Sequence, residues 1–111
     1  MIDKANAEHY IWGENCDGWH LVKSELLSVI QELMPPHTSE VRHIHSRSRQ
    51  FFFVLSGQAT IEVDGTEHPL NNQQGLEIPP GVAHRVLNNS KSELSFLVVS
   101  CPPSLGDRSN I

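Results

Sequence analysis

With 111 residues, the chain is long enough for one hydrophobic core but not for two, so residues 1–111 are expected to form a single domain. Its 38% hydrophobic and 19% charged residues are typical of a folded globular protein and argue against disorder. The formal net charge of −5 argues against a nucleic-acid partner, because phosphate binding requires clustered positive charge.

The chain also lacks the sequence signals of membrane insertion and export. It has no run of eighteen apolar residues, and residues 1–10 contain no apolar segment of the kind found in signal peptides. Cys16 and Cys101 are its only cysteines, and such sparse use of cysteine is typical of a reducing compartment. We therefore expect a cytoplasmic protein that binds no membrane.

Turn-forming residues interrupt the chain at short intervals. Between them lie short runs rich in valine, isoleucine, leucine and phenylalanine, and this spacing predicts an all-β sandwich or barrel. The turn signals are, in chain order, Gly13, Asp17-Gly18, Pro35-Pro36, Gly57, Asp64-Gly65, Gly75, Pro79-Pro80-Gly81 and Asn88-Asn89.

The first predicted strands are residues 19–23 and 25–34. Leucine, glutamate and glutamine make the second segment (ELLSVIQELM) compatible with a helix, but Pro35-Pro36 ends it and the neighbouring pattern favours a strand. Residues 50–56 (QFFFVLS) predict a third strand, which is apolar on both faces after Gln50.

The second half of the chain continues the strand pattern. Residues 58–63 alternate apolar and polar side chains, which predicts a half-buried strand, and Asp64-Gly65 joins it to residues 66–70 as a hairpin. Residues 102–111 are polar and turn-rich, so we expect a surface tail after a core at about residues 19–101. Three more strands are predicted at residues 76–78, 82–87 and 94–100.

Histidines stand at two places where strands are predicted to begin. Residues i and i+2 of a strand point to one face, so His43 and His45 project side by side. Gln50 opens the next strand, and His84 follows the rigid turn at residues 79–81. Three imidazole nitrogens and one amide oxygen would suit a divalent transition metal. A His-x-His pair also occurs by chance, so these residues alone leave both interpretations open.

The same residues resemble the two motifs of a small single-domain cupin. The first family motif reads G-x5-H-x-H-x3,4-E-x6-G, and its spacing is matched by His43, His45, Gln50 and Gly57. The second reads G-x5-P-x-G-x2-H-x3-N, and its spacing is matched by Pro79, Gly81, His84 and Asn88. The two motifs span residues 37–57 and 73–88.

The resemblance implies an all-β, double-stranded β-helix (jelly-roll) cupin barrel. It also implies one divalent metal ion (Zn, Fe, Mn or Ni) held by four residues of this chain, namely His43, His45, Gln50 and His84. The chain departs from the motifs at their opening glycines, which are His37 and Gln73 here, and at Gln50, where the family usually has glutamate. Glutamine cancels none of the metal's charge, so the site should bind metal less tightly and favour an anionic ligand.

Strand parity predicts which side chains surround such a site. If the four predicted ligands face inward, Phe52, Val54 and Val86 share that face and would line a substrate pocket. In the last strand, parity leaves two possibilities open: the inward pair is either Phe96 and Val98 or Leu97 and Val99.

The opposite face of the third strand would then be apolar and exposed. Phe51, Phe53 and Leu55 lie on it, and a patch of this kind marks an interface, so we expect a homodimer. The alternative is that an N-terminal strand of the same chain covers the patch.

Other candidate residues have weaker support. His37 has the parity of the His-x-His pair but lies far along the strand, and Cys16 is interpreted as a packing residue, an extra ligand or a reactive thiol. His9, His20 and His68 have no matching partner in the sequence.

Because the cupin fold hosts many functions, three hypotheses remain. The first is a metal-dependent enzyme, of dioxygenase or cyclase and isomerase type, acting on a small oxygenated and anionic organic substrate. The second is a sugar-phosphate isomerase-like enzyme, for which Arg42, Arg47 and Arg49 would have to bind the phosphate. The third is a non-enzymatic module that binds a metal or small ligand.

Overall fold

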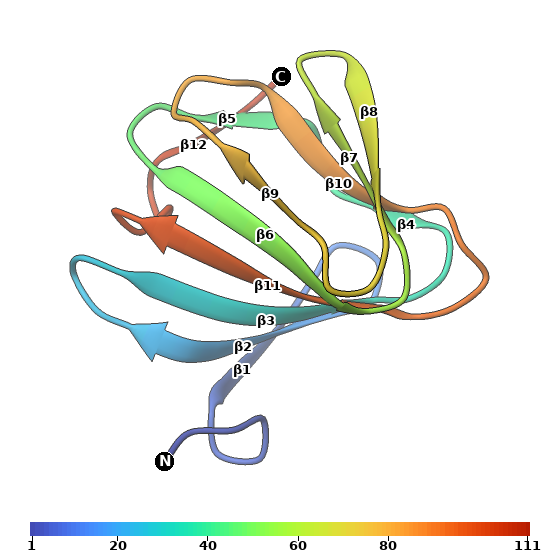
Figure 1. Cartoon of the computed structure of the whole chain (residues 1–111). Coiled ribbons are helices and arrows are strands. Elements are labelled where there is room, and N and C mark those ends of the chain that lie inside the picture. Colours follow the sequence, from blue (N-terminus) through green and yellow to red (C-terminus); the bar gives the residue numbers. More distant parts are fainter.

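The computed structural model describes residues 1–111 as twelve β-strands, with no helix (Figure 1). No helix is therefore present that could cross a bilayer. The strands are β1 (Glu8–Trp12), β2 (Cys16–Lys23), β3 (Ser28–Met34), β4 (Thr38–Ser39), β5 (His43–His45), β6 (Arg49–Ser56), β7 (Ala59–Val63), β8 (Thr66–Leu70), β9 (Gly75–Ile78), β10 (His84–Asn88), β11 (Leu94–Cys101) and β12 (Arg108–Asn110).

These strands form two antiparallel sheets that face each other. One sheet has the order β1-β2-β3-β11-β6-β9, and the other has the order β12-β5-β10-β7-β8, with β4 also pairing with β10. In Figure 1 the two sheets curve around a common interior. This is the double-stranded β-helix (jelly roll) that the sequence predicted.

Alternation along β6 and β11 builds the wall between the core and the outside. Phe52 and Val54 are almost completely buried, whereas Phe51 is 41% exposed. In β11, Phe96 and Val98 are the inward pair, which decides between the two parities that the sequence left open. Both strands have the period of two expected for a sheet with one buried face.

The segment that was compatible with a helix is a strand. It begins at Ser28 rather than residue 25, because Ser24 and Leu27 close the turn before it. The Ser24 hydroxyl donates to the Leu27 carbonyl and accepts from the Leu27 amide at 2.9 and 3.1 Å. Residues 25–27 therefore belong to the β2–β3 hairpin turn.

The N-terminus contributes a strand that the sequence did not predict. β1 pairs antiparallel with β2, which begins at Cys16 rather than residue 19. Gly13 and Asn15 both have positive φ angles, of 53° and 61°, in the turn between the two strands. β1 lies at the edge of its sheet, next to β2 and away from β6, so it does not cover the Phe51 side of β6.

The polar tail expected at residues 102–111 lies largely at the surface, and its last part also forms a strand. β12 pairs with β5, and Arg108 stands opposite His45 in the register. The side chain of Asp107 is 2% exposed and accepts hydrogen bonds from the Ser46 hydroxyl and from the amides of Arg47 and Ser48. These bonds, above all that from Ser46, hold the pKa of Asp107 well below its ordinary value. The C-terminus therefore fixes the loop that follows the His-x-His pair.

The two positions where the cupin motifs have an opening glycine adopt left-handed backbone conformations. His37 has a φ of 60° and Gln73 a φ of 64°. This conformation is easy for glycine and costs other residues about 1–2 kcal/mol. The turns of the motifs are thus retained in spite of the substitutions.

Candidate metal centre and its cavity

Three histidines from two strands meet in the interior. His43 and His45 project from β5 and His84 from the adjacent β10, and all three are at most 5% exposed. His84 stands opposite His43 in the register, and their ring centroids are 4.4 Å apart. One ring nitrogen from each histidine lies within 4.8 Å of the others, a spacing suited to a shared ion. The predicted convergence of the three histidines is confirmed.

Backbone carbonyls define the tautomers of two of these rings. Nδ1 of His43 lies 2.7 Å from the Val41 oxygen, and Nδ1 of His84 lies 2.9 Å from the Val82 oxygen. A carbonyl oxygen can only accept, so each Nδ1 carries the proton and donates it. In both rings Nε2 therefore presents a lone pair, and such a bond to the other nitrogen is the usual support of a metal-binding histidine.

Gln50 lies beside His84 and presents an oxygen to it. The amide nitrogen of Gln50 donates to the Ser100 hydroxyl at 3.0 Å, and its Oε1 lies 3.1 Å from Nε2 of His84. With Nδ1 of His84 protonated, Nε2 of His84 and Oε1 of Gln50 are both acceptors, so two lone pairs face each other in the buried interior. A cation beside them would satisfy both, and the donor set of three nitrogens and one oxygen fits a transition metal.

Burial keeps the three imidazoles neutral and ready to coordinate. Desolvation, with smaller contributions from the guanidinium of Arg108 and the other two rings, lowers the pKa of His43 to about 3. The pKa values of His45 and His84 are also lowered, again mainly by desolvation. Unlike Nδ1 of the other two rings, the Nδ1 atom of His45 is buried without a hydrogen-bond partner.

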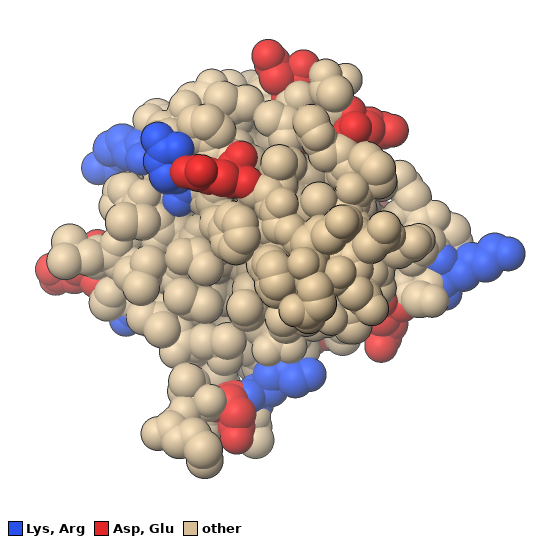
Figure 2. All heavy atoms as spheres, in the orientation of Figure 1, with Lys and Arg blue, Asp and Glu red and all other residues tan.

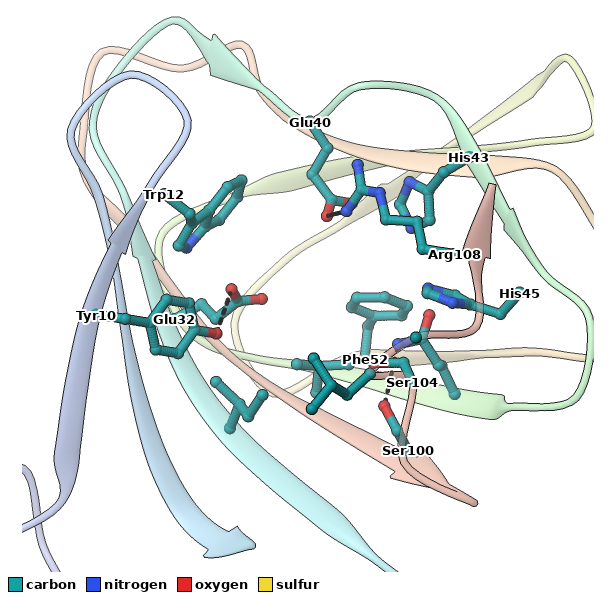
Figure 3. A pocket seen from close by; sticks show the side chains of 15 residues that line it. Tyr10, Trp12, Glu32, Glu40, His43, His45, Phe52, Ser100, Ser104 and Arg108 are labelled. Atoms are coloured by element: carbon teal, nitrogen blue, oxygen red, sulfur yellow. Dashed lines mark hydrogen bonds and ion pairs between the residues drawn. The ribbon is translucent and has the colours of Figure 1, made fainter. Parts of the chain in front are cut away.

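A cavity of about 280 Å³ opens beside the histidines. Figure 3 shows His43, His45 and Arg108 on one side of it and Tyr10, Trp12 and Glu32 on the other. Its lining comes from both sheets and from the segment before β12. The lining residues are Tyr10, Trp12, Ile30, Glu32, Glu40, His43, His45, Gln50, Phe52, Val98, Ser100, Ser104, Leu105, Gly106 and Arg108.

The three residues predicted to line a pocket lie in two places. Phe52 is part of the cavity lining, and its ring meets the His84 ring edge-on at 6.0 Å. Val54 and Val86 belong to the buried core cluster and not to the cavity lining. Ser100, which the sequence did not single out, is part of the lining and orients Gln50.

The cavity has an acidic side that sequence reasoning missed. Glu32 projects inward from β3 and accepts a hydrogen bond from the Tyr10 hydroxyl at 3.3 Å. The signal for Glu32 was its position two residues from both Ile30 and Met34, which places its carboxylate on the same, inward face of the strand. The contact with Tyr10 had no such signal, because Tyr10 lies on β1, the strand that was not predicted. Desolvation by burial and the nearby carboxylate of Glu40 raise the pKa of Glu32 to about 8.

Glu40 and Arg108 connect the acidic side to the histidines. Glu40 accepts a hydrogen bond from the Val86 amide at 3.0 Å, and a guanidinium nitrogen of Arg108 lies 3.9 Å from its carboxylate. Desolvation raises the pKa of Glu40 to about 7. Arg108 also donates to the carbonyl of Val41, the residue that orients His43.

The weaker candidates lie outside the histidine cluster. His37 is exposed in its turn, and Cys16 is buried in the core without a disulfide, as is expected of a packing cysteine. Desolvation raises the pKa of the Cys16 thiol. Arg47 and Arg49 pair with Asp107 and Glu77, and neither arginine lines the cavity.

Comparison with known proteins identifies the family of this fold and site. The family model described as "Cupin domain" matches residues 30–100, more than half of the chain. The chain belongs to the cupin family. It is an all-β cupin with a buried cluster of three histidines consistent with a metal site.

The known proteins that are similar to this chain have names that denote several different activities. Over 78 residues the chain is 33% identical to "Polyketide synthase CurC" from Streptomyces cyaneus, which covers 67% of this chain and 51% of CurC. The chain thus spans about half the length of this relative.

Two solved structures share the fold at low sequence identity. The polyketide cyclase RemF from Streptomyces resistomycificus matches with a TM-score of 0.86 at 16% identity, covering 100% of this chain and 84% of RemF. A cupin-superfamily sugar phosphate isomerase from Silicibacter pomeroyi matches with a TM-score of 0.80 at 22% identity, covering 93% of this chain and 76% of that protein.

Proposed function

We propose that the protein is a metal-dependent enzyme of the cyclase or isomerase type, acting on a small oxygenated and anionic organic substrate. The observation that carries this proposal is the cavity itself, since its lining combines metal-type donors with a buried carboxylic acid. The printed names of CurC and RemF, a polyketide synthase and a polyketide cyclase, favour this reaction type over dioxygenase chemistry.

His43, His45, His84 and Gln50 would hold the metal. When bound, a divalent ion would supply Lewis-acid polarisation of a substrate oxygen. All four residues are neutral, so none of the ion's charge would be cancelled by the protein, and a substrate that develops negative charge would be favoured. Phe52 and Val98 would exclude water from the reacting carbons, and Ser100 would keep the Gln50 oxygen directed at His84.

Metal loading followed by substrate assays tests this proposal. Freshly purified protein should retain about one zinc, iron, manganese or nickel ion per chain, measured by elemental analysis. Incubation of the loaded protein with β-diketones and polyphenols should consume no dioxygen in an oxygen electrode. Dioxygen uptake would favour the dioxygenase alternative, and metal retention without turnover would favour a binding module. A protein that neither retains a metal ion on purification nor binds one that is added afterwards would contradict the proposal.

A sugar-phosphate isomerase-like activity is a second candidate, because one structural relative carries that name. Phosphate binding calls for cationic side chains in the cavity, and Arg108 is the only lysine or arginine in its lining. Arg42 pairs with Glu62 instead, at 3.1 Å. Turnover of hexose phosphates would establish this activity, and its absence with loaded protein would remove it.

We further propose that the protein forms a homodimer through the outer face of β6 and β11. Phe51 and Phe53 stack there at 6.1 Å, and Figure 2 shows few charged side chains over this region, with most at its edges. Light scattering should give the mass of a dimer and, for Phe51→Lys, the mass of a monomer. Leu26→Lys, at a turn residue that is 79% exposed, should leave the dimer intact. A monomeric wild-type protein would contradict this proposal.

A further inference from the structure

We propose that Glu32 is the proton-transfer residue of this site, which takes a proton from a substrate carbon next to a carbonyl group and returns it to another substrate atom. The inference rests on the proposed function and deepens it, because it restricts the substrate to carbonyl compounds with an acidic C–H bond. Glu32 would be a catalytic residue, and Tyr10 its positioning residue.

The geometry of the cavity places Glu32 where such a group is needed. Glu32, His43 and His45 line the same cavity, and in Figure 3 Glu32 lies across it from the two histidines. A small substrate that engages the histidine side with an oxygen would therefore turn its carbon atoms toward Glu32. The side chain of Glu40 is held by the Val86 amide and lies near Arg108, whereas the Tyr10 hydrogen bond uses Oε2 of Glu32 and leaves its Oε1 to face a substrate.

The sequence builds the contact between Tyr10 and Glu32 through a glycine. Gly18 stands between them in the sheet register, opposite Tyr10 on β1 and opposite Glu32 on β3. A Cβ atom at Gly18 would collide with the ring and hydroxyl of Tyr10. Because Gly18 has no side chain, the Tyr10 ring can lie across β2 and reach Glu32. Glycine inside a strand usually weakens the strand, and this contact explains its presence at a buried position of β2.

The surroundings of Glu32 suit reversible proton transfer near neutral pH. Burial and Glu40 raise its pKa to about 8, whereas the Tyr10 hydrogen bond and the guanidinium of Arg108 lower it. From β2 the buried Cys16 thiol faces the same region, and from β11 the register partner is the apolar Phe96. A general acid or base is most effective when its pKa lies close to the working pH.

The proposed step balances without any further reactant. Ionised Glu32 takes the proton, the electron pair of the C–H bond forms a C=C bond, and the carbonyl oxygen becomes the oxygen of an enolate. Protonated Glu32 then donates the same proton in one of two ways. In a substrate with a conjugated C=C bond it protonates the far carbon of the dienolate, so the C=O bond re-forms and the C=C bond is shifted. In a substrate with a hydroxyl group on the β-carbon it protonates that hydroxyl, and the enolate pair re-forms the C=O bond and leaves a C=C bond between the α- and β-carbons as the C–O bond breaks and water departs. Neither outcome needs an oxidant or a reductant.

Proton exchange with solvent tests this step directly. Zinc-loaded protein would be incubated in D₂O with hydroxyacetone, a probe small enough for the cavity, and loss of its CH₂ proton signal followed by NMR. Glu32→Gln should slow the exchange by about 100-fold or more, because it keeps the shape but cannot carry the proton. Glu77→Gln is the matched control, since Glu77 is exposed, pairs with Arg49 and is not part of the cavity lining.

A second measurement does not depend on activity. In metal-free protein labelled with ¹³C at glutamate carboxyl groups, one resonance should titrate near pH 8 and be absent from Glu32→Gln. Tyr10→Phe should move this titration to higher pH, because it removes a hydrogen bond that stabilises the ionised form. An ordinary titration near pH 4.5 would overturn the inference.

The outcomes separate this inference from the proposed function. Exchange by wild-type protein that Glu32→Gln leaves unchanged would overturn the role of Glu32 but leave a metal-dependent enzyme intact. A wild-type protein that retains metal yet exchanges no protons would overturn the proton-transfer role as well. Retention of no metal would overturn the proposed function itself.

Discussion

The two sides of the cavity differ in how they are built. The histidine side comes from β5 and β10, whose ligand-type residues are neutral and close to one another in sheet register. The acidic side joins Tyr10 of β1, Glu32 of β3 and Glu40 of a loop, and its carboxyl groups have raised pKa values. One side thus presents neutral nitrogen donors of the kind that bind a cation, and the other presents carboxyl groups that keep their protons to higher pH.

The largest expected effect comes from breaking the histidine side. His84→Ala removes one of three imidazoles, and we expect the affinity for zinc to fall by more than about 100-fold in a calorimetric titration. His37→Ala is the matched control, because His37 is exposed outside the cluster and should leave the affinity unchanged. An unchanged affinity of His84→Ala, with a native circular dichroism spectrum, would mean that the three rings do not share an ion.

The acidic side should change how the free energy of unfolding depends on pH. The folded-state pKa of Glu32 is raised from 4.5 to about 8. Between these two pH values the folded protein binds more protons than the unfolded chain, so the free energy of unfolding falls as pH rises through this range. Glu32→Gln should remove this loss, and at pH 9 its free energy of unfolding should exceed that of the wild type by at least about 1 kcal/mol. Urea denaturation at pH 5 and pH 9 measures the difference. Equal pH dependence in the two proteins would contradict the assignment of the raised pKa.

Adding a negative charge to the histidine side should strengthen its binding of zinc. Gln50→Glu introduces a carboxylate beside Nε2 of His84, and we expect about tenfold tighter zinc binding, which corresponds to ~1.4 kcal/mol. Gln58→Glu adds the same charge at an exposed position and should have little effect. If Gln50→Glu binds zinc equally or more weakly, the argument from ligand charge fails.

The smallest effect concerns a turn before the histidine side. His37 has a positive φ angle, so His37→Gly should relieve backbone strain and raise stability by up to about 1 kcal/mol in thermal or urea unfolding. Gly65→Ala provides the reverse change, because Gly65 has a φ of 86° and a Cβ there meets no other atom. Destabilisation by His37→Gly would show that the imidazole makes a contribution larger than the strain.

Much of the fold and of the histidine side was predictable. Period-two alternation marked β7, and apolar runs between turn residues marked β6 and β11. The spacing of His43, His45 and His84 indicated a shared site before any coordinates. The parity rule placed Phe52 correctly on the cavity wall, because side-chain direction in a regular strand depends only on position. The ligand role of Gln50 stays a prediction, since its oxygen faces His84 but metal binding is untested.

Local patterns did not reveal β1, β4 or β12, because short edge strands carry few buried residues and little alternation. Glu8–Trp12 is mostly exposed, and Arg108–Asn110 is exposed throughout. The role of Asp107 was equally hidden, since its hydrogen-bond partners Ser46, Arg47 and Ser48 lie about sixty positions earlier in the chain.

The sequence by itself determined the all-β class, the main strands and the histidines that meet, because alternation and motif spacing are local properties of the chain. Only the tertiary structure decided that Tyr10 crosses Gly18 to reach Glu32, and that Glu32 faces His43 and His45 across one cavity. The physical reason is that pairing between distant strands depends on register and burial, which no short stretch of residues specifies. Desolvation at that place then gives a glutamate its raised pKa, and burial is a property of the folded molecule alone.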